Sequence, residues 1–154
     1  MNKEPELTIE DYQKAKKEVA FLVNVLSQTI PDIVGRALGA VGLMAGKEAA
    51  LKMPIYFKSS EIQPVLDGIE RYLTGGFEIT HKIIDENESV VIEQTFEKCV
   101  LREVCEIEDI PLKGELCSLF HHYINGMISE LTARNFRMNI LKTGDTCIIR
   151  YSKV

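Results

Sequence analysis

The sequence has no long apolar run, since each of its hydrophobic stretches is only a handful of residues. A transmembrane helix needs about 20 mostly apolar residues, so no membrane-spanning segment is predicted. Residues 1–18 are polar and charged, which argues against a secretory signal peptide. We therefore expect a cytoplasmic protein that does not bind a membrane.

The chain also lacks an excess of basic residues. It carries 18 lysines and arginines against 23 aspartates and glutamates, which gives a net charge of −5 and a pI near 5.3. The two signs are interspersed, so no basic stripe is available to neutralise a phosphate backbone. The composition argues against nucleic-acid binding by this chain alone.

No internal repeat, low-complexity tract or linker divides the sequence. At 154 residues and 45% hydrophobic composition, it fits one ordinary domain. A chain of this length buries roughly 70% of its unfolded surface on folding. We expect a single domain over residues 1–154 that is stable without disulfides.

Hydrophobic periodicity divides this domain into helices and strands. Apolar residues recur at helical spacing in the first half, and the period changes to two at Phe77. The third helix is predicted to open with a capping box formed by Ser60 and Gln63. Segregated elements of this kind are typical of an α+β fold, with helices packed on a mainly antiparallel sheet of about four strands. The predicted helices are 9–28 (ended by Pro31), 32–52, 61–73 and 114–131, and the predicted strands are 77–84, 89–96, 135–142 and 145–152.

Four glycines share one face of the second predicted helix, at positions 35, 39, 42 and 46. Glycine costs about 1 kcal/mol relative to alanine inside a helix, so a close neighbour is expected to approach this backbone. A packed helix, a dimer partner or a ligand would each explain the pattern. We include Gly35, Gly39 and Gly42 among the candidate ligand-binding residues. The adjacent GLMAGK segment lacks the spacing of a phosphate-binding loop, so nucleotide binding is not predicted.

The four cysteines all lie in the second half of the chain and contain no CxxC pair. Free thiols in a cytoplasmic chain bind metal, respond to redox conditions or are simply buried. If the four converge in space, they form a four-thiolate site for zinc or an iron–sulfur cluster. Two or three buried thiols without metal are the alternative. The candidate metal ligands are Cys99, Cys105, Cys117 and Cys147.

Cys117 lies in the first turn of the long helix 114–131. The positive end of a helix lowers a thiol pKa, which favours a thiolate at this position. His121 follows four residues later at the same edge of the apolar stripe, so it is either a neighbour of the cysteine site or a core residue. His122 points the other way and is expected in solvent. A Cys117–His121 dyad for nucleophilic catalysis lacks an obvious third group to orient it.

Three further residues complete the candidate ligand-binding set. His81 alternates with apolar residues of its strand, so it faces the core, either as a satisfied core histidine or as a polar contact in a ligand pocket. Phe120 and Tyr123 belong to the apolar stripe of the long helix. No GxSxG motif occurs, so no serine hydrolase is predicted.

The second half of the chain also carries a family pattern. Cys99 follows a strand, Cys117 opens a helix with Gly126 nine residues further on, and GDTC occupies residues 144–147. This pattern resembles the C-terminal part of the 4-vinyl reductase domain family, also called hydrocarbon-binding proteins, known in archaea and as sensor modules of bacterial regulators. The glycine-rich second helix is similar to the N-terminal region of that family.

The resemblance implies the fold of vesicle-transport-particle subunits, a homodimer and an apolar ligand cavity. It also implies zinc near the C-terminal cysteines, held by one cysteine of the long helix and by cysteines and a glutamate of the last hairpin. Only Cys117 and Cys147 carry over, because Asn139 and Phe136 stand where the family has a cysteine and a glutamate. Cys105 is then a candidate to replace the missing ligand.

We therefore expect a small-molecule-binding or sensor protein with an apolar cavity and a cysteine-ligated metal centre. The metal is zinc, with an iron–sulfur cluster as the alternative. Its expected partners are a small hydrophobic molecule, a second copy of the chain and a protein effector. A cysteine-dependent or reductase-associated enzyme that uses Cys117 is the second hypothesis. A dimeric scaffold with inert buried cysteines, whose glycine helix forms the seam, is the third.

Overall fold

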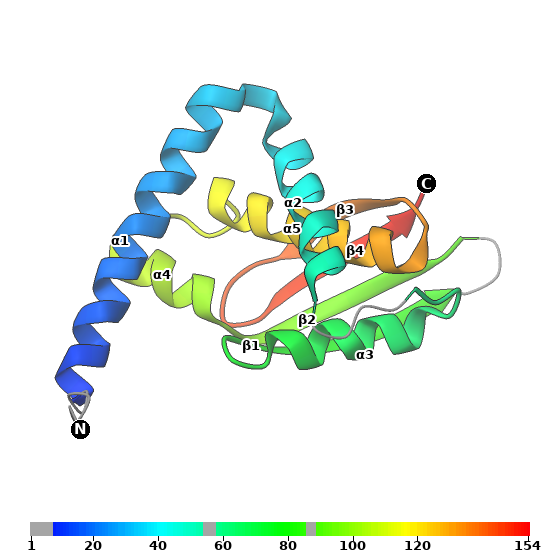
Figure 1. Ribbon diagram of the computed structural model, residues 1–154, viewed down its shortest axis with the longest axis horizontal. Coiled ribbons are helices and arrows are strands. Elements are labelled where there is room, and N and C mark those ends of the chain that lie inside the picture. The colour runs from blue at the N-terminus through cyan, green and yellow to red at the C-terminus, as the bar shows by residue number, and fades with distance from the viewer. Residues whose placement is uncertain (1–7, 54–57, 86–88) are drawn as a thin grey trace, which may run out of the picture.

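A computed structural model describes residues 8–53, 58–85 and 89–154, which form five α-helices, one short 3₁₀ helix and four strands. The α+β class predicted from the sequence is confirmed. Figure 1 shows the order of the elements along the chain. They are α1 (Ile9–Val34), the 3₁₀ helix η1 (Gly35–Ala37), α2 (Leu38–Lys52), α3 (Ile62–Leu73), β1 (Phe77–Asp85), β2 (Val91–Cys99), α4 (Val100–Glu108), α5 (Glu115–Thr132), β3 (Phe136–Lys142) and β4 (Cys147–Lys153).

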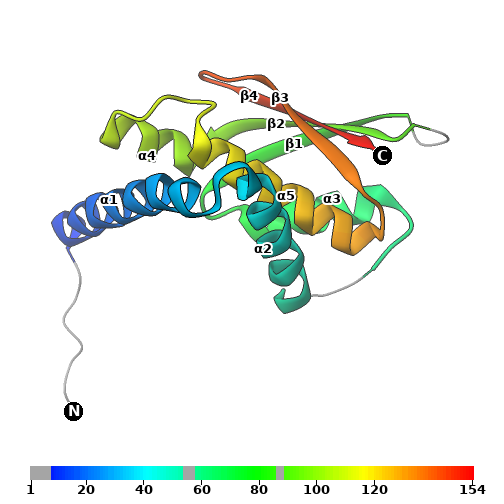
Figure 2. The same cartoon turned by 90° about the horizontal axis from the view of Figure 1, so that it is seen from above.

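The four strands form one antiparallel sheet in the order β1-β2-β4-β3. Both predicted hairpins are present, and β2 pairs with β4 to join them. Helices α3 and α5 lie against one face of this sheet, and α2 lies beyond α5 (Figure 2). The inward residues of β2 and β4 pack against the apolar stripe of α5, which buries one continuous core. This layer includes Ile92, Phe96, Ile149 and Tyr151 from the sheet and Ile124, Met127 and Ile128 from α5.

The break between the first two helices differs from the prediction. Helix α1 continues past Pro31, and it ends where the Gly35 amide donates to the Pro31 carbonyl. Proline removes one hydrogen bond but does not force a stop, whereas Gly35 has φ of 54°, a conformation that L side chains rarely adopt. The predicted stop at Pro31 is therefore wrong by one turn.

Helix α1 carries an apolar surface that no other part of the described chain covers. Only Ala20 and Ser27 of this helix are buried, and Ala20 packs with Val104 and Cys105 of α4. Figure 1 shows α1 running beside α4. Most of its large apolar side chains face solvent. The exposed set is Ile9, Tyr12, Val19, Phe21, Leu22, Val25, Leu26 and Ile33.

The glycine face of α2 packs against the backbone of α5. A Cβ atom at Gly46 would lie 1.9 Å from the Tyr123 carbonyl oxygen, and one at Gly126 would lie 2.1 Å from the Leu43 carbonyl oxygen. Both distances are impossible for real atoms, so the two helices cross with glycine on each side. The close neighbour of this glycine face is therefore a helix of the same chain.

Two local features were not predicted correctly. Helix α4 was not predicted, although Val104 and Cys105 form its buried side. The proposed capping box is also wrong, because α3 begins after Glu61 and the Glu61 amide donates to the Ser59 hydroxyl. Gln63 is thereby free of a capping role and turns toward β1.

The α2–α5 crossing leads to a stability prediction. Gly46→Ala should lower the free energy of unfolding by about 3 kcal/mol, because the added methyl group meets backbone that cannot move aside. Gly75→Ala is the matched control, since no atom of the described residues lies within 4 Å of its Cβ position, and its effect should stay within about 0.5 kcal/mol. Urea denaturation measures both. Equal stability of the two variants would contradict the crossing.

Candidate functional site

An aromatic cluster lies where α5 crosses the sheet. Phe77 and Phe120 stack with their ring centroids 4.7 Å apart, and Phe96 meets Phe120 edge-on at 6.2 Å. The His121 ring also lies edge-on to Phe96, at 5.0 Å. Tyr123 extends the stack on the other side of Phe120. The two predicted ligand-binding aromatics, Phe120 and Tyr123, therefore belong to one half-buried aromatic surface.

Several polar atoms in the adjacent core have no hydrogen-bond partner within the part of the chain that the structure describes. They are Nε2 and Oε1 of Gln94, Nδ1 of His121 and the hydroxyl of Tyr151. Gln94 and Tyr151 are fully buried, and His121 is 4% exposed. A buried polar group without a partner costs about 1–3 kcal/mol, so these groups lower the stability of the fold.

The strand register places these groups on one side of the sheet. Gln94 lies opposite Ile149, and Tyr151 lies opposite Ile92, so Gln94 and Tyr151 are diagonal neighbours on the inner face. His121 reaches the same layer from α5 through its contact with Phe96, two residues after Gln94. We refer to Gln94, His121 and Tyr151 as the polar triplet. Apolar core side chains flank it, and His81 of β1 lies opposite Gln94.

Burial keeps His121 and Tyr151 uncharged, and the Gln94 amide does not ionise. Burial lowers the pKa of His121 to about 3, with a smaller effect from the charge of His122, and it raises the pKa of Tyr151. The triplet can thus accept and donate hydrogen bonds without carrying charge at neutral pH. His122 is half-buried beside Gly39 and Gly42, so the prediction that it lies in solvent is wrong.

A surface hollow lies between α2, α5 and β3, with a volume of about 570 Å³. Of the predicted ligand-binding residues, Gly35 and Gly39 line it, together with His122 and Asn125. Gly42 is instead occupied by its contact with α5, where an added Cβ would meet the Leu119 carbonyl oxygen at 2.6 Å. The candidate glycines thus divide between a cleft and a helix crossing.

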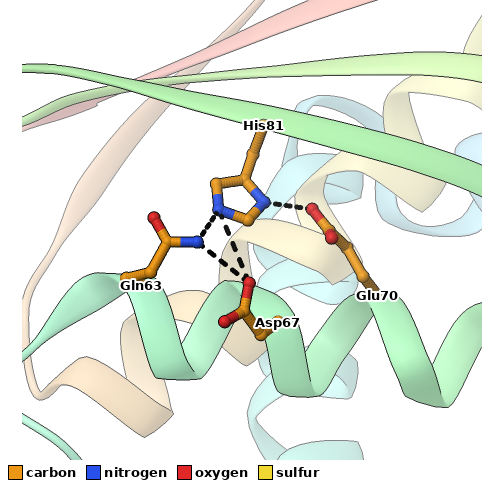
Figure 3. A network of polar contacts seen from close by, with 4 residues as sticks. All are labelled: Gln63, Asp67, Glu70 and His81. Atoms are coloured by element: carbon orange, nitrogen blue, oxygen red, sulfur yellow. Dashed lines mark hydrogen bonds and ion pairs between the residues drawn. The ribbon is translucent and has the colours of Figure 1, made fainter.

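His81 lies on β1, directly opposite Gln94 of β2, and faces α3 (Figure 3). Its Nδ1 contacts the Glu70 carboxylate, its Nε2 lies 2.6 Å from the Gln63 amide nitrogen, and Asp67 lies 3.8 Å from Nε2. His81 is therefore a hydrogen-bonded histidine at the core edge. Its three partners were not predicted. Their spacing of i, i+4 and i+7 on α3 was a signal, but the sequence does not say which strand they face.

The four cysteines are brought to one region of the structure, and all are buried. Cys99 precedes α4, and its thiol accepts from backbone amides of the first turn. Cys105 lies further along α4, Cys117 lies in the first turn of α5, and Cys147 begins β4. Arg102 extends from α4 to within 3.7 Å of the Cys147 sulfur.

The thiols influence one another electrostatically. Burial raises the pKa of Cys105 to about 11, with further contributions from Cys117, Cys99 and Cys147. The pKa of Cys117 is raised as well, because burial outweighs the backbone of Lys113 and the nearby Arg102. The expected lowering of the Cys117 pKa at the helix end is therefore wrong, and a protonated thiol does not favour the nucleophile hypothesis.

The arrangement can be tested against the metal implied by the family resemblance. Four soft thiols are a suitable donor set for zinc or an iron–sulfur cluster. Tetrahedral zinc with bonds of about 2.3 Å places sulfurs about 3.8 Å apart. Among the described residues, however, no three of these thiols have their sulfurs all within 4.8 Å of one another. The donor chemistry fits, and ligation would require the sulfurs to move closer.

The comparisons with known proteins support the fold. No protein-family model matches the chain, and no curated protein matches its sequence significantly. One similar structure is a crystal structure of the phenol-responsive sensory domain of the transcription activator PoxR with phenol. The likeness covers 90% of this chain and 74% of that one, with a TM-score of 0.60 and 19% sequence identity. At this identity the two share a fold.

Within the described residues, no helix is long and apolar enough to cross a membrane.

The burial of His121 predicts a pH dependence of stability. Its pKa is lower in the folded state than the usual 6.5, so the unfolded chain binds the proton first as pH falls. Stability should therefore drop from about pH 6.5 toward pH 3, by up to about 1.4 kcal/mol per pH unit from this group. Urea denaturation between pH 4 and pH 7 measures the slope. His121→Phe should reduce the slope, and an unchanged slope would show that His121 does not titrate as its burial requires.

Proposed function

We propose that this chain is a small-molecule-binding sensory domain whose ligand lies between α5 and the sheet, beside the polar triplet. The supporting observation is the set of buried polar atoms without partners in an otherwise apolar layer. A ligand with one hydrogen-bonding group would satisfy some of these atoms, and its apolar body would suit the surrounding side chains. The aromatic surface around Phe120 would border the ligand.

The structural neighbour supports the same class of function. It is a phenol-responsive sensory domain in a structure with phenol, which is a small aromatic molecule with one hydroxyl. We propose that this chain takes a ligand of that chemical class and belongs to the 4-vinyl reductase domain family. A neutral His121 and a neutral Tyr151 suit a neutral ligand better than an anionic one.

Tyr151→Phe tests the ligand site. Without ligand, removal of an unpartnered hydroxyl should leave the fold intact and raise the free energy of unfolding by about 1 kcal/mol. With phenol as the probe, loss of one hydrogen bond should weaken binding about fivefold. Isothermal titration measures the affinity and urea denaturation the stability.

Tyr72→Phe is the matched control, because this tyrosine is 48% exposed on α3. It should leave both phenol affinity and stability at wild-type values. Failure of phenol and of larger phenolic compounds to bind the wild-type chain would contradict the proposed ligand class. Equal binding by the Tyr151 variant and the wild type would contradict the proposed position.

We further propose that the four cysteines form a metal centre, with zinc as the expected ion. Their common burial and mutual effects on pKa support a shared site, and Cys105 supplies the donor that the last hairpin lacks. Bound zinc would require the thiols to lose their protons, would offset part of the thiolate charge, and would fix the start of α5 to α4 and β4. An iron–sulfur cluster remains the alternative occupant.

Metal content after anaerobic purification tests this centre. One zinc per chain without visible absorption is the expected result, and Cys105→Ser and Cys117→Ser should each lower the zinc content at least tenfold. Stoichiometric iron with visible absorption would show that the centre is an iron–sulfur cluster and not a zinc site. Wild-type protein without metal after both purification and reconstitution would rule the centre out.

The proposed sensor is a cytoplasmic homodimer that passes its signal to a protein effector. The exposed apolar surface of α1 supports association, because contiguous apolar surface of this kind marks interaction sites. The glycine face of α2 is occupied by α5 of the same chain, so α1 is the better seam. We assign no catalytic residue.

A further inference from the structure

We propose that Asp67 and His81, with Gln63 and Glu70 in support, form a binding site for a divalent transition-metal ion between α3 and β1. The site is separate from the cysteines, and it borders the polar triplet, because His81 lies directly opposite Gln94 in the β1–β2 pair. Ligand atoms of Asp67, Glu70 and His81 all lie within 4.8 Å of one another, and this is the only such group of three or more among the described residues. Figure 3 shows the three α3 side chains directed toward the His81 ring.

The Glu70 contact determines which ring nitrogen of His81 is available. A carboxylate oxygen accepts hydrogen bonds, so Nδ1 of His81 must donate to Glu70. In the neutral ring, Nε2 then carries the lone pair. A carboxylate behind the histidine is also the usual second partner of a metal-bound imidazole, which it orients and makes more basic. Glu70 is therefore a positioning residue.

The distance between Nε2 and Asp67 suits a shared ion. Oδ1 of Asp67 lies 3.8 Å from Nε2, which is too far for a hydrogen bond between them. Bonds of about 2.1 Å to one ion would place these two atoms roughly 3.3 Å apart, so a shift of about half an ångström closes the site. Neither backbone has to move for such a change, because the Asp67 side chain is 39% exposed.

The Gln63 amide lies between Nε2 of His81 and Oδ1 of Asp67, where the ion would bind, and Gln63 can also act as a ligand of the ion. Its amide nitrogen lies 2.6 Å from Nε2 and 2.9 Å from Oδ1 of Asp67, so it bridges the two groups that we assign as ligands. The Gln63 side chain is exposed at the start of α3 and can turn its amide. The carbonyl oxygen would then face the ion as a third ligand.

The outer side of the site is open to solvent. Asp67 and Glu70 line a surface cleft of about 600 Å³, together with Thr74 and Lys98. Water or an anionic molecule could therefore complete the coordination. One imidazole with oxygen ligands suits ions such as Mn²⁺, Co²⁺ and Zn²⁺, whereas thiolates favour softer ions. Mn²⁺ is accordingly a probe that distinguishes this site from the cysteines.

The test titrates the reduced wild-type chain with Mn²⁺ and follows the free ion by electron paramagnetic resonance. We expect saturation at one ion per chain and paramagnetic broadening of the His81 ring signals in the NMR spectrum. Asp67→Asn should weaken binding at least tenfold through loss of a ligand. Glu70→Gln should weaken it about 10–100-fold and also change the His81 tautomer in the ¹⁵N spectrum.

Glu61→Gln is the matched control, since Glu61 is an exposed carboxylate that precedes α3 and has no side-chain capping role. Its affinity for Mn²⁺ should equal that of the wild type. Thermal unfolding without metal verifies that each variant folds. Absence of saturable binding by both Mn²⁺ and Co²⁺, or equal Mn²⁺ affinity of wild type and Asp67→Asn, would overturn the site and leave the group as an ion-pair contact between α3 and β1.

Discussion

The structure depends on the crossing of α2 and α5, where backbone meets backbone. Gly46 and Gly126 each leave no space for a methyl group, so the two helices approach more closely than any other residue would allow. This approach holds α5 between α2 and the sheet. Helix α5 can then supply His121 to the core, Cys117 to the cysteine region and His122 to the cleft beside α2. One helix therefore connects every candidate site except that of His81.

Fixing α5 in this way has an energetic consequence for the layer beneath it. Ile124, Met127 and Ile128 are fully buried against the sheet, and each contributes hydrophobic stabilisation of about 1.5–3 kcal/mol. The polar triplet opposes that contribution, because each unpartnered group costs about 1–3 kcal/mol. A chain selected only for stability would replace Gln94 by an apolar residue. The buried Gln94 amide is therefore easier to explain by binding than by folding.

The sequence predicted the sheet better than the sites. Strict alternation from Phe77 to Ile83 indicates a strand, because a side-chain period of two matches a pleated strand and does not match a helix. Gln94 was not predicted, but the same alternation could have identified it, since it shares an inward face with Ile92 and Phe96. A buried glutamine indicates that a hydrogen-bonding group is needed at that position. The sequence could not identify what packs against the glycine face of α2. Glycine spacing shows that a neighbour comes close, but it does not distinguish a helix from a dimer partner or a ligand. Helix α4 was missed because the nine-residue segment follows β2 directly, without a turn residue between them.

The grouping of side chains from distant segments needs the fold itself. Whether β1 or another strand faces Asp67 and Glu70 is decided by how α3 packs, and a helix in another register would leave His81 against apolar residues alone. The same packing separates donors of two kinds. Thiols gather where α4, α5 and β4 meet, whereas oxygen and nitrogen donors gather between α3 and β1 at the edge of the sheet. Because thiolates favour softer ions and oxygen donors favour Mn²⁺, this separation would direct the two kinds of ion to different sites, whereas Zn²⁺ suits both.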